Sequence, residues 1–175
     1  MKPSLSRLGA AAIAVIAMSA PAYAGPSTPE VPNELVPPGG NKVFLVAHAE
    51  GWQIYRCDPG NVWTLVAPSA DLYAQNDKFI GTHYAGPTWQ TLDGSLVTAT
   101  KEKEVTVDPT AINWLLLKKK TSVAGPGGDR LSGTTWIQRL NTVGGRAPAA
   151  SECDVVNETD RIAYEADYYF WKASA

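Results

Sequence analysis

Residues 42–66, KVFLVAHAEGWQIYRCDPGNVWTLV, decide the fold class of this chain. They contain three apolar or aromatic runs, separated first by Glu50-Gly51 and then by Asp58-Pro59-Gly60-Asn61. β-Branched and aromatic residues favour strands, whereas Pro and Gly supply the backbone angles of tight turns. The stretch therefore predicts three consecutive strands with short connections, over residues 42–49, 52–57 and 62–66.

The same pattern of short apolar runs and turn residues continues to the end of the chain. It predicts further strands at residues 78–84, 88–92, 96–107, 134–141 and 162–172. Asp93-Gly94 tolerates two positive φ values, which is typical of a hairpin turn. Frequent turns between short strands indicate a mainly all-β protein with little helix, an antiparallel β-sandwich or barrel of about eight to ten strands.

Residues 112–118, INWLLLK, are the one stretch that also resembles a helix. Asp108-Pro109-Thr110 precedes it, with Asp as a cap and Pro at the first helical position. Three successive leucines, however, have no helical period, and the length of the run fits a buried strand. The pattern favours a strand here and leaves the helix as the alternative.

The first 24 residues have the pattern of a cleavable signal peptide. Lys2 and Arg7 form a positive flank, residues 8–20 are an apolar run, and Ala22 and Ala24 supply the small-residue cleavage site. The apolar run is shorter than the roughly 20 residues that a membrane-spanning helix needs. We expect cleavage after Ala24, a secreted or periplasmic location, and no membrane span in the mature chain.

The remainder divides into a leader and one domain. Residues 25–41 contain five prolines and few apolar residues, which predicts an extended leader. Residues 42–175 have the size of a single β domain. The full chain has 15 Lys and Arg against 17 Asp and Glu, and it lacks the basic face that neutralises phosphates in a nucleic-acid complex. No nucleic-acid partner is therefore expected.

The chain has two cysteines, Cys57 and Cys153. Disulfides persist in oxidising compartments, so an exported chain with two cysteines favours a Cys57–Cys153 bridge. A pair of metal-binding thiolates and a free nucleophilic thiol are the alternatives.

His48 and His83 are the only histidines in the sequence, and they suggest a metal site. Alternation places His48 and Glu50 on one strand face, while His83 lies on another strand, followed by Asp93. Two imidazoles with one or two carboxylates can hold zinc or copper, or act as a general acid and base. No spacing of a known metal motif supports this, so hydrogen-bonded strand histidines, with no cofactor, are the favoured interpretation.

Aromatic side chains give a second kind of candidate site. The chain has six tryptophans and seven tyrosines, and most are expected in the core. Trp89 and Tyr84 flank Gly86-Pro87, a turn that we expect to present them at the surface for ligand binding.

Seven stretches together resemble a family of exported bacterial and fungal proteins catalogued as a domain of unknown function, number 3455. They are residues 36–39 (VPPG), 43–57 (VFLVAHAEGWQIYRC), 80–95 (IGTHYAGPTWQTLDGS), 112–117 (INWLLL), 137–145 (IQRLNTVGG), 153–154 (CD) and 164–170 (YEADYYF). The resemblance covers nearly the whole mature domain and implies one exported globular unit. It implies no catalytic residues.

Two functional hypotheses follow. The first is non-catalytic binding of a small ligand, a glycan or a cell-envelope partner, because the chain is rich in aromatic residues and has no catalytic motif. The second is a metal-dependent enzyme or redox protein that uses His48 and His83.

Overall fold

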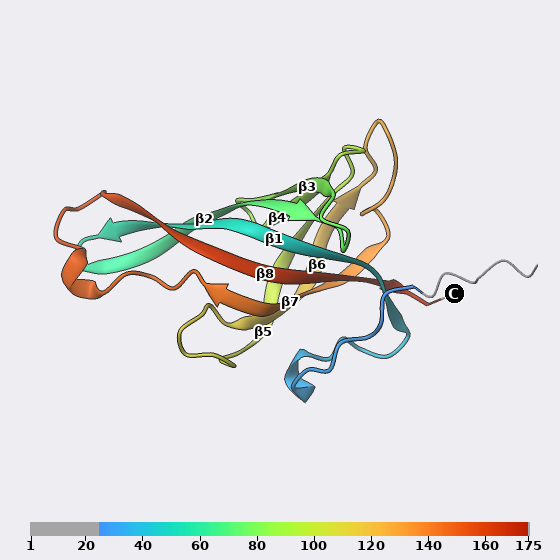
Figure 1. Ribbon diagram of the computed structural model, residues 1–175, viewed down its shortest axis with the longest axis horizontal. Helices are drawn as coiled ribbons and strands as arrows, with labels where there is room; N and C mark the ends of the chain where they lie inside the picture. Colours follow the sequence, from blue (N-terminus) through green and yellow to red (C-terminus); the bar gives the residue numbers. More distant parts are fainter. Residues whose placement is uncertain (1–24, 175) are drawn as a thin grey trace, which may run out of the picture.

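Eight antiparallel strands close into a barrel in the computed structural model, which describes residues 25–174 (Figure 1). The strands are β1 (Asn41–Asp58), β2 (Val62–Tyr73), β3 (Phe79–Tyr84), β4 (Thr88–Thr91), β5 (Leu96–Val105), β6 (Trp114–Val123), β7 (Thr134–Gly144) and β8 (Thr159–Ala173). Two single-turn 3-10 helices, η1 (Asn33–Leu35) and η2 (Ala150–Glu152), complete the described chain. Consecutive strands pair, and β8 returns to pair with β1. The predicted all-β class with little helix is confirmed, and the architecture is the barrel.

β1 is one continuous strand of 18 residues, so the predicted break at Glu50-Gly51 is wrong. Gly51 pairs with Ala70 on one side and with Tyr164 on the other. A Cβ at this position would overlap the carbonyl oxygen of Ser69 and the backbone of Ala70. Gly51 therefore allows two strands to approach closely instead of turning the chain.

β2 runs on to Tyr73, past residue 66, where the sequence predicted the end of this strand. Pro68 lies inside this strand, opposite Gln53 of β1. β3 pairs with β2 only from Ala70 to Tyr73, so Pro68 faces no strand on its other side. A missing N–H is tolerated at such an edge position.

The barrel interior is built by alternation along the strands, most clearly along β8. Tyr164, Ala166, Tyr168 and Phe170 are buried in the main core. Glu165, between them, lies on the outer face and is exposed. This two-residue period is that of a strand, the element that the sequence predicted for residues 162–172.

The three leucines of residues 115–117 lie in a strand, β6, as favoured from the sequence. Leu115 and Leu117 belong to the interior core, whereas Leu116 lies in a second cluster on the outer face of the sheet with Leu35 and Leu140. All three are buried because this strand is covered on both faces.

The proline-rich segment before β1 provides the outer cover. It forms no strand, but its Leu35 is fully buried and its backbone carbonyl accepts a hydrogen bond of 2.7 Å from Gln138 Nε2. The predicted signal peptide, residues 1–24, lies outside the described residues. Within residues 25–174 no helix is long and apolar enough to cross a bilayer.

An arm extends from the barrel where β1, β2 and β8 continue past the other strands (Figure 1). Near its end a disulfide joins Cys57 to Cys153, with the two Cα atoms 5.2 Å apart, as predicted. The bridge closes a sequence separation of 96 residues. Restricting the unfolded chain in this way stabilises the fold by about 4 to 5 kcal/mol in the simple entropic account.

Candidate functional site

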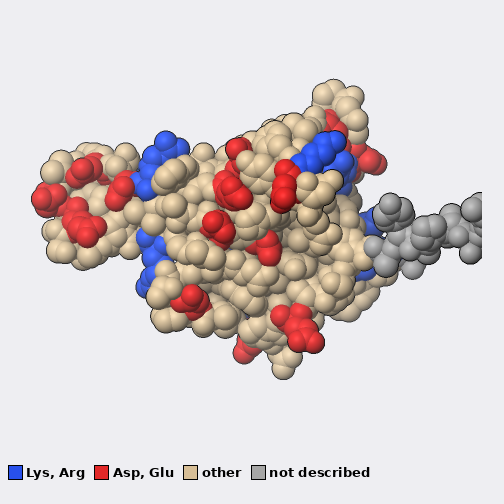
Figure 2. All heavy atoms as spheres, viewed as in Figure 1, with Lys and Arg blue, Asp and Glu red and all other residues tan. Residues whose placement is uncertain are grey.

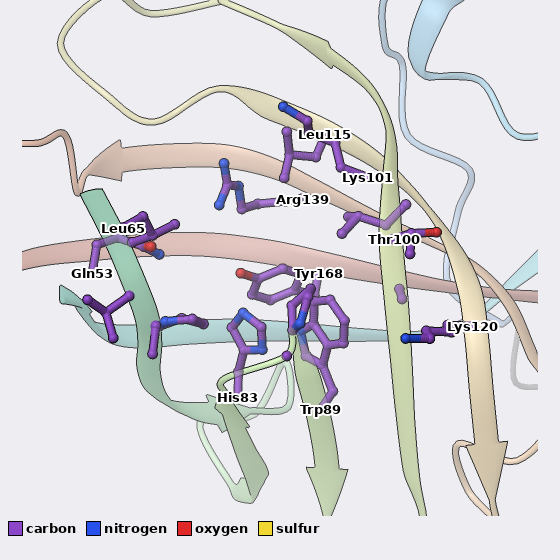
Figure 3. Close-up of a pocket in the computed structure, with 17 residues that line it drawn as sticks. Gln53, Leu65, His83, Trp89, Thr100, Lys101, Leu115, Lys120, Arg139 and Tyr168 are labelled. Atoms are coloured by element: carbon purple, nitrogen blue, oxygen red, sulfur yellow. The ribbon is translucent and has the colours of Figure 1, made fainter. Parts of the chain in front are cut away.

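A pocket of about 440 Å³ opens into the barrel beside its two shortest strands, β3 and β4 (Figure 3). β3 has six residues and β4 has four, whereas β2 and β5 have 12 and 10. Residues 62–69 of β2 therefore lack a neighbour on one side, and β5 continues beyond its pairing with β4, which ends at Thr98. The mouth is framed by residues 65–68 of β2, the turn at Gly86-Pro87, and residues 99–101 of β5.

Two residues of the pocket wall carry a buried N–H group that has no hydrogen-bond partner among the described residues. These groups are Nε2 of Gln53 and Nε1 of Trp89, and each residue is only 1% exposed. Gln53 reaches the interior because it is in phase with Ala47 and Ala49 of the core along β1. A buried donor without an acceptor costs about 1–3 kcal/mol, so these two groups are unusual for a barrel interior.

His83 lies between the pocket and the core, stacked on Trp89 with ring centroids 4.3 Å apart and planes 8° from parallel. Its Nδ1 lies 2.8 Å from the carbonyl oxygen of Thr88, and because that oxygen can only accept, Nδ1 carries the proton. Burial lowers the pKa of His83 to about 3. The imidazole is therefore neutral near pH 7, with Nε2 as a hydrogen-bond acceptor.

Arg139 and Tyr168 form the deeper polar wall. Arg139 is in phase with buried Ile137 on β7, so its side chain lies inside the barrel, where Nε and Nη2 donate to the Asn113 carbonyl at 3.1 and 2.8 Å. Burial raises the pKa of Tyr168, whose hydroxyl stays protonated. Figure 3 shows Gln53, His83, Trp89, Arg139 and Tyr168 directed into one shared space.

Lysines lie at the rim of the pocket. Lys101 is opposite Leu117, an interior residue, and its amine contacts Glu104 Oε1 at 2.9 Å. Lys120 occupies a β-bulge, because Thr121 pairs with Thr98 and Lys119 with Ala99. A bulge redirects a side chain, and here Lys120 joins the pocket lining. Three cationic residues line this pocket: Lys101, Lys120 and Arg139. None of its described lining residues is Asp or Glu.

The four predicted metal-site residues fall in three places. His48 and Glu50 share the outer face of β1, as expected, with His48 Nε2 3.7 Å from Glu50 Oε1. His48 Nδ1 lies 2.9 Å from Asp167 Oδ1 of β8. His83 is buried inside the barrel, and Asp93 lies in the β4–β5 turn. Within residues 25–174 no group of three or more His, Cys, Asp or Glu is placed to hold a metal ion.

Asp93 organises its turn. Its Oδ1 accepts hydrogen bonds from the Thr91 hydroxyl at 2.7 Å and from the backbone N–H of Ser95 at 3.0 Å, and its Oδ2 accepts one from the backbone N–H of Arg130 at 3.0 Å. These bonds hold the pKa of Asp93 well below its usual range. The predicted hairpin turn is present, but only Gly94, at φ +82°, has a positive φ, so the expected pair of positive φ values at Asp93-Gly94 is wrong.

The two predicted aromatic ligand residues lie on opposite sides of the barrel wall. Tyr84 is 37% exposed, and its hydroxyl donates to Gln90 Oε1 at 3.1 Å. Trp89 is buried, contrary to the expected surface display, because it points into the core against Tyr168 and Phe170. It still lines the pocket, from the inside.

Gln53 and Arg139 are pocket residues that the sequence reasoning missed. Both are polar side chains at interior positions of their strands, in phase with apolar neighbours. That mismatch between polarity and strand period was the available signal.

Comparisons with known proteins give one family. A protein-family model described as "Protein of unknown function (DUF3455)" matches residues 37–172. No curated protein and no solved structure matches the chain.

Proposed function

The chain belongs to the DUF3455 family of proteins of unknown function, and we propose that it is an exported protein that binds a small molecule, without catalysis, in the barrel pocket. The ligand enters between the free edge of β2 and β5, over the turn at Gly86-Pro87. It lies against His83 and Arg139.

The unpartnered N–H groups of Gln53 and Trp89 carry this proposal. Both belong to side chains that the barrel buries, and both line the pocket. Leaving two donors unsatisfied costs about 1–3 kcal/mol each, and a ligand that supplies acceptors recovers that free energy on binding. Pockets with a few convergent polar groups in a mainly apolar wall are the usual sites for small molecules.

The dimensions of the pocket favour a small ligand over a protein partner. A volume of about 440 Å³ falls within the range of about 300–1,000 Å³ that is common for such sites. Its apolar lining comes from the β2 edge and from the interior leucines of β6, Leu115 and Leu117.

Binding without catalysis is supported by the state of His83. A general base works best when its pKa is close to the working pH, and the pKa of His83 is about 3. The imidazole is a weak proton acceptor but a good hydrogen-bond acceptor for a ligand. The other histidine, His48, lies on the outer face of β1, away from this pocket's lining.

Export is supported by the Cys57–Cys153 bridge, because disulfides persist in oxidising compartments. It is also in keeping with the signal-peptide pattern of the first 24 residues.

Fluorescence titration with N-phenylnaphthylamine, a neutral apolar probe, tests the pocket. We expect saturable binding with one site per chain. Leu65 is 48% exposed at the mouth, so Leu65→Trp obstructs entry with little effect on folding and abolishes binding. Leu92→Trp is the matched control, because Leu92 is 67% exposed and lies outside the pocket lining.

Equal binding by the wild type and Leu65→Trp, or no saturable binding by the wild type, would contradict the proposal. Circular dichroism of both variants shows whether the barrel is intact.

A further inference from the structure

We infer that the ligand of this pocket is an amphipathic organic acid, whose anionic head lies against Arg139 and whose apolar body lies along β2 and β6. This inference rests on the proposed binding function and adds the chemical class of the ligand. It follows from the charge at the pocket, from the hydrogen-bonding capacity of its wall, and from its apolar lining.

Charge at the pocket is opposite in sign to that of the whole chain. Arg139, Lys101 and Lys120 line the pocket, and no Asp or Glu is among its described lining residues. The chain as a whole has a net charge of −2. Figure 2 shows acidic side chains gathered at the end of the arm and scattered over the barrel face in view. The concentration of cations at one concave site is therefore a local feature, and it attracts an anion.

Arg139 is the cation best placed to hold the head of the ligand. Its side chain is partly buried and forms no ion pair among the described residues, although, after the hydrogen bond from Lys101, its charge also helps to lower the pKa of the nearby Glu104 carboxyl. Nε and Nη2 both donate to the Asn113 carbonyl, which fixes the guanidinium and leaves Nη1 for another acceptor. A fixed guanidinium with limited solvent contact binds a carboxylate more strongly than a mobile surface lysine does.

The hydrogen-bonding groups of the wall fit the same head. A carboxylate only accepts hydrogen bonds, and the unpartnered Nε2 group of Gln53, on the same side of Tyr168 as Arg139, only donates. The Nε2 lone pair of His83 would repel an anion, which directs the head towards Gln53 and Arg139. Figure 3 shows Arg139 and Gln53 on one side of Tyr168, with His83 and Trp89 on the other.

The rim lysines add a weaker contribution. Lys101 already contacts Glu104, so part of its charge is compensated. Lys120 forms no ion pair with a described residue, and the β-bulge places it at the pocket. It is exposed, so its attraction to the ligand is screened by solvent and salt.

The apolar lining accounts for the rest of the ligand. Leu65 and Pro68 of β2 face Leu115 and Leu117 of β6 across the pocket. A fully hydrophilic anion, such as inorganic phosphate, would leave these surfaces without contacts. An acid with an apolar body would cover them, and the burial of apolar area would supply most of its affinity.

Two fluorescent probes with the same apolar body test the inference. Anilinonaphthalene sulfonate carries an anionic, acceptor-only head, and N-phenylnaphthylamine lacks it. We expect the anionic probe to bind at least about tenfold more tightly, and we expect added salt to reduce that difference. Leu65→Trp should abolish the binding of both probes, which assigns the signal to the pocket.

Arg139→Gln should weaken binding of the anionic probe by about 10- to 100-fold and leave the neutral probe unchanged. Lys120→Gln should weaken the anionic probe by about two- to fivefold. Lys118→Gln is the matched control, with the same change in net charge. Lys118 lies on the outer face of the same strand, 5.8 Å from the ring of Trp136, and should have no effect on either probe.

Equal affinity for both probes, with no effect of Arg139→Gln, would overturn the inference and leave the binding pocket itself supported. Failure of both probes to bind would instead contradict the proposed function. If Arg139→Gln does not fold, Lys120→Glu decides the question. A lower affinity for the anionic probe alone supports the inference, and an unchanged preference overturns it.

Discussion

Two pairs of buried Gln and Trp residues occupy opposite faces of the barrel wall, and they differ in one respect. On the outer face, Gln138 Oε1 accepts a hydrogen bond of 2.9 Å from Trp171 Nε1, and Gln138 Nε2 donates to the Leu35 carbonyl. On the inner face, Gln53 and Trp89 each keep an N–H without a partner. The residue types and the burial are alike, while the hydrogen bonding is not.

The difference indicates two roles for the same chemistry. The outer pair fixes the segment before β1 onto the sheet, and every polar atom in that contact has a partner. The inner pair is costly to the folded chain, yet it lines a pocket that the short β3 and β4 leave open. A polar group that is satisfied by its own chain is structural, whereas one that is unsatisfied at a pocket is available to a ligand.

Gln138→Leu has the largest expected effect. The substitution leaves the Leu35 carbonyl and the Trp171 N–H buried without partners, at about 1–3 kcal/mol each, so the free energy of unfolding should fall by about 3–5 kcal/mol. Urea unfolding with the disulfide intact measures this. A loss below about 1 kcal/mol would show that water replaces both bonds.

Leu35→Ala removes the apolar contact of the outer face and keeps the hydrogen bond of its backbone carbonyl. Leu35 is fully buried with Leu116 and Leu140, so a loss of about 3 kcal/mol in the free energy of unfolding is expected. Affinity for anilinonaphthalene sulfonate should stay at the wild-type value, since this cluster lies outside the barrel. Weaker probe binding by a folded Leu35→Ala variant would show that the outer cluster influences the pocket.

Asp93 is another polar residue whose hydrogen bonds are all made within the chain, and its contribution to stability depends on pH. Because its folded pKa is lowered, Asp93 stabilises the fold above the unfolded pKa of about 3.9, and this contribution is lost as the pH falls through the lowered folded value. Asp93→Asn should cost about 2 kcal/mol near pH 7, and the difference from wild type should shrink below about pH 4. Urea unfolding at both pH values is the measurement. A difference that is independent of pH would rule out the carboxylate as its source.

Gln53→Leu has the smallest expected effect on stability, although it is chemically matched to Gln138→Leu. It removes an unpartnered donor from an apolar wall, so the free energy of unfolding should change by less than about 1 kcal/mol, or rise. Affinity for the anionic probe should fall in the same variant. A loss of stability as large as that of Gln138→Leu would end the distinction between the two faces.

Sequence patterns predicted the strands of this barrel better than the side chains that lie inside it. The strands predicted at residues 162–172 and 112–118 correspond to β8 and β6. Gly51 was misjudged because a glycine that permits close strand contact has the same sequence signal as a glycine that ends a strand.

The pocket residues were harder to predict, because strand pairing decides which faces meet. His48 and His83 were plausible partners until the barrel placed one outside and one inside. The turn beside Trp89 suggested surface display, but the position of Trp89 in β4 directs its side chain inward. Arg139 and Gln53 were missed because polar side chains in strands are expected to face water.

The short β3–β4 hairpin has one more consequence. Within the described barrel, this hairpin fills only part of the space between β2 and β5 and forms one edge of the pocket mouth. Its length therefore sets the size of the opening. Lengthening β3 and β4 would extend their hydrogen bonding along β2 and close the pocket mouth. Shortening β3 and β4 would widen the mouth. The length of this one hairpin would therefore determine how wide a molecule can pass through the opening.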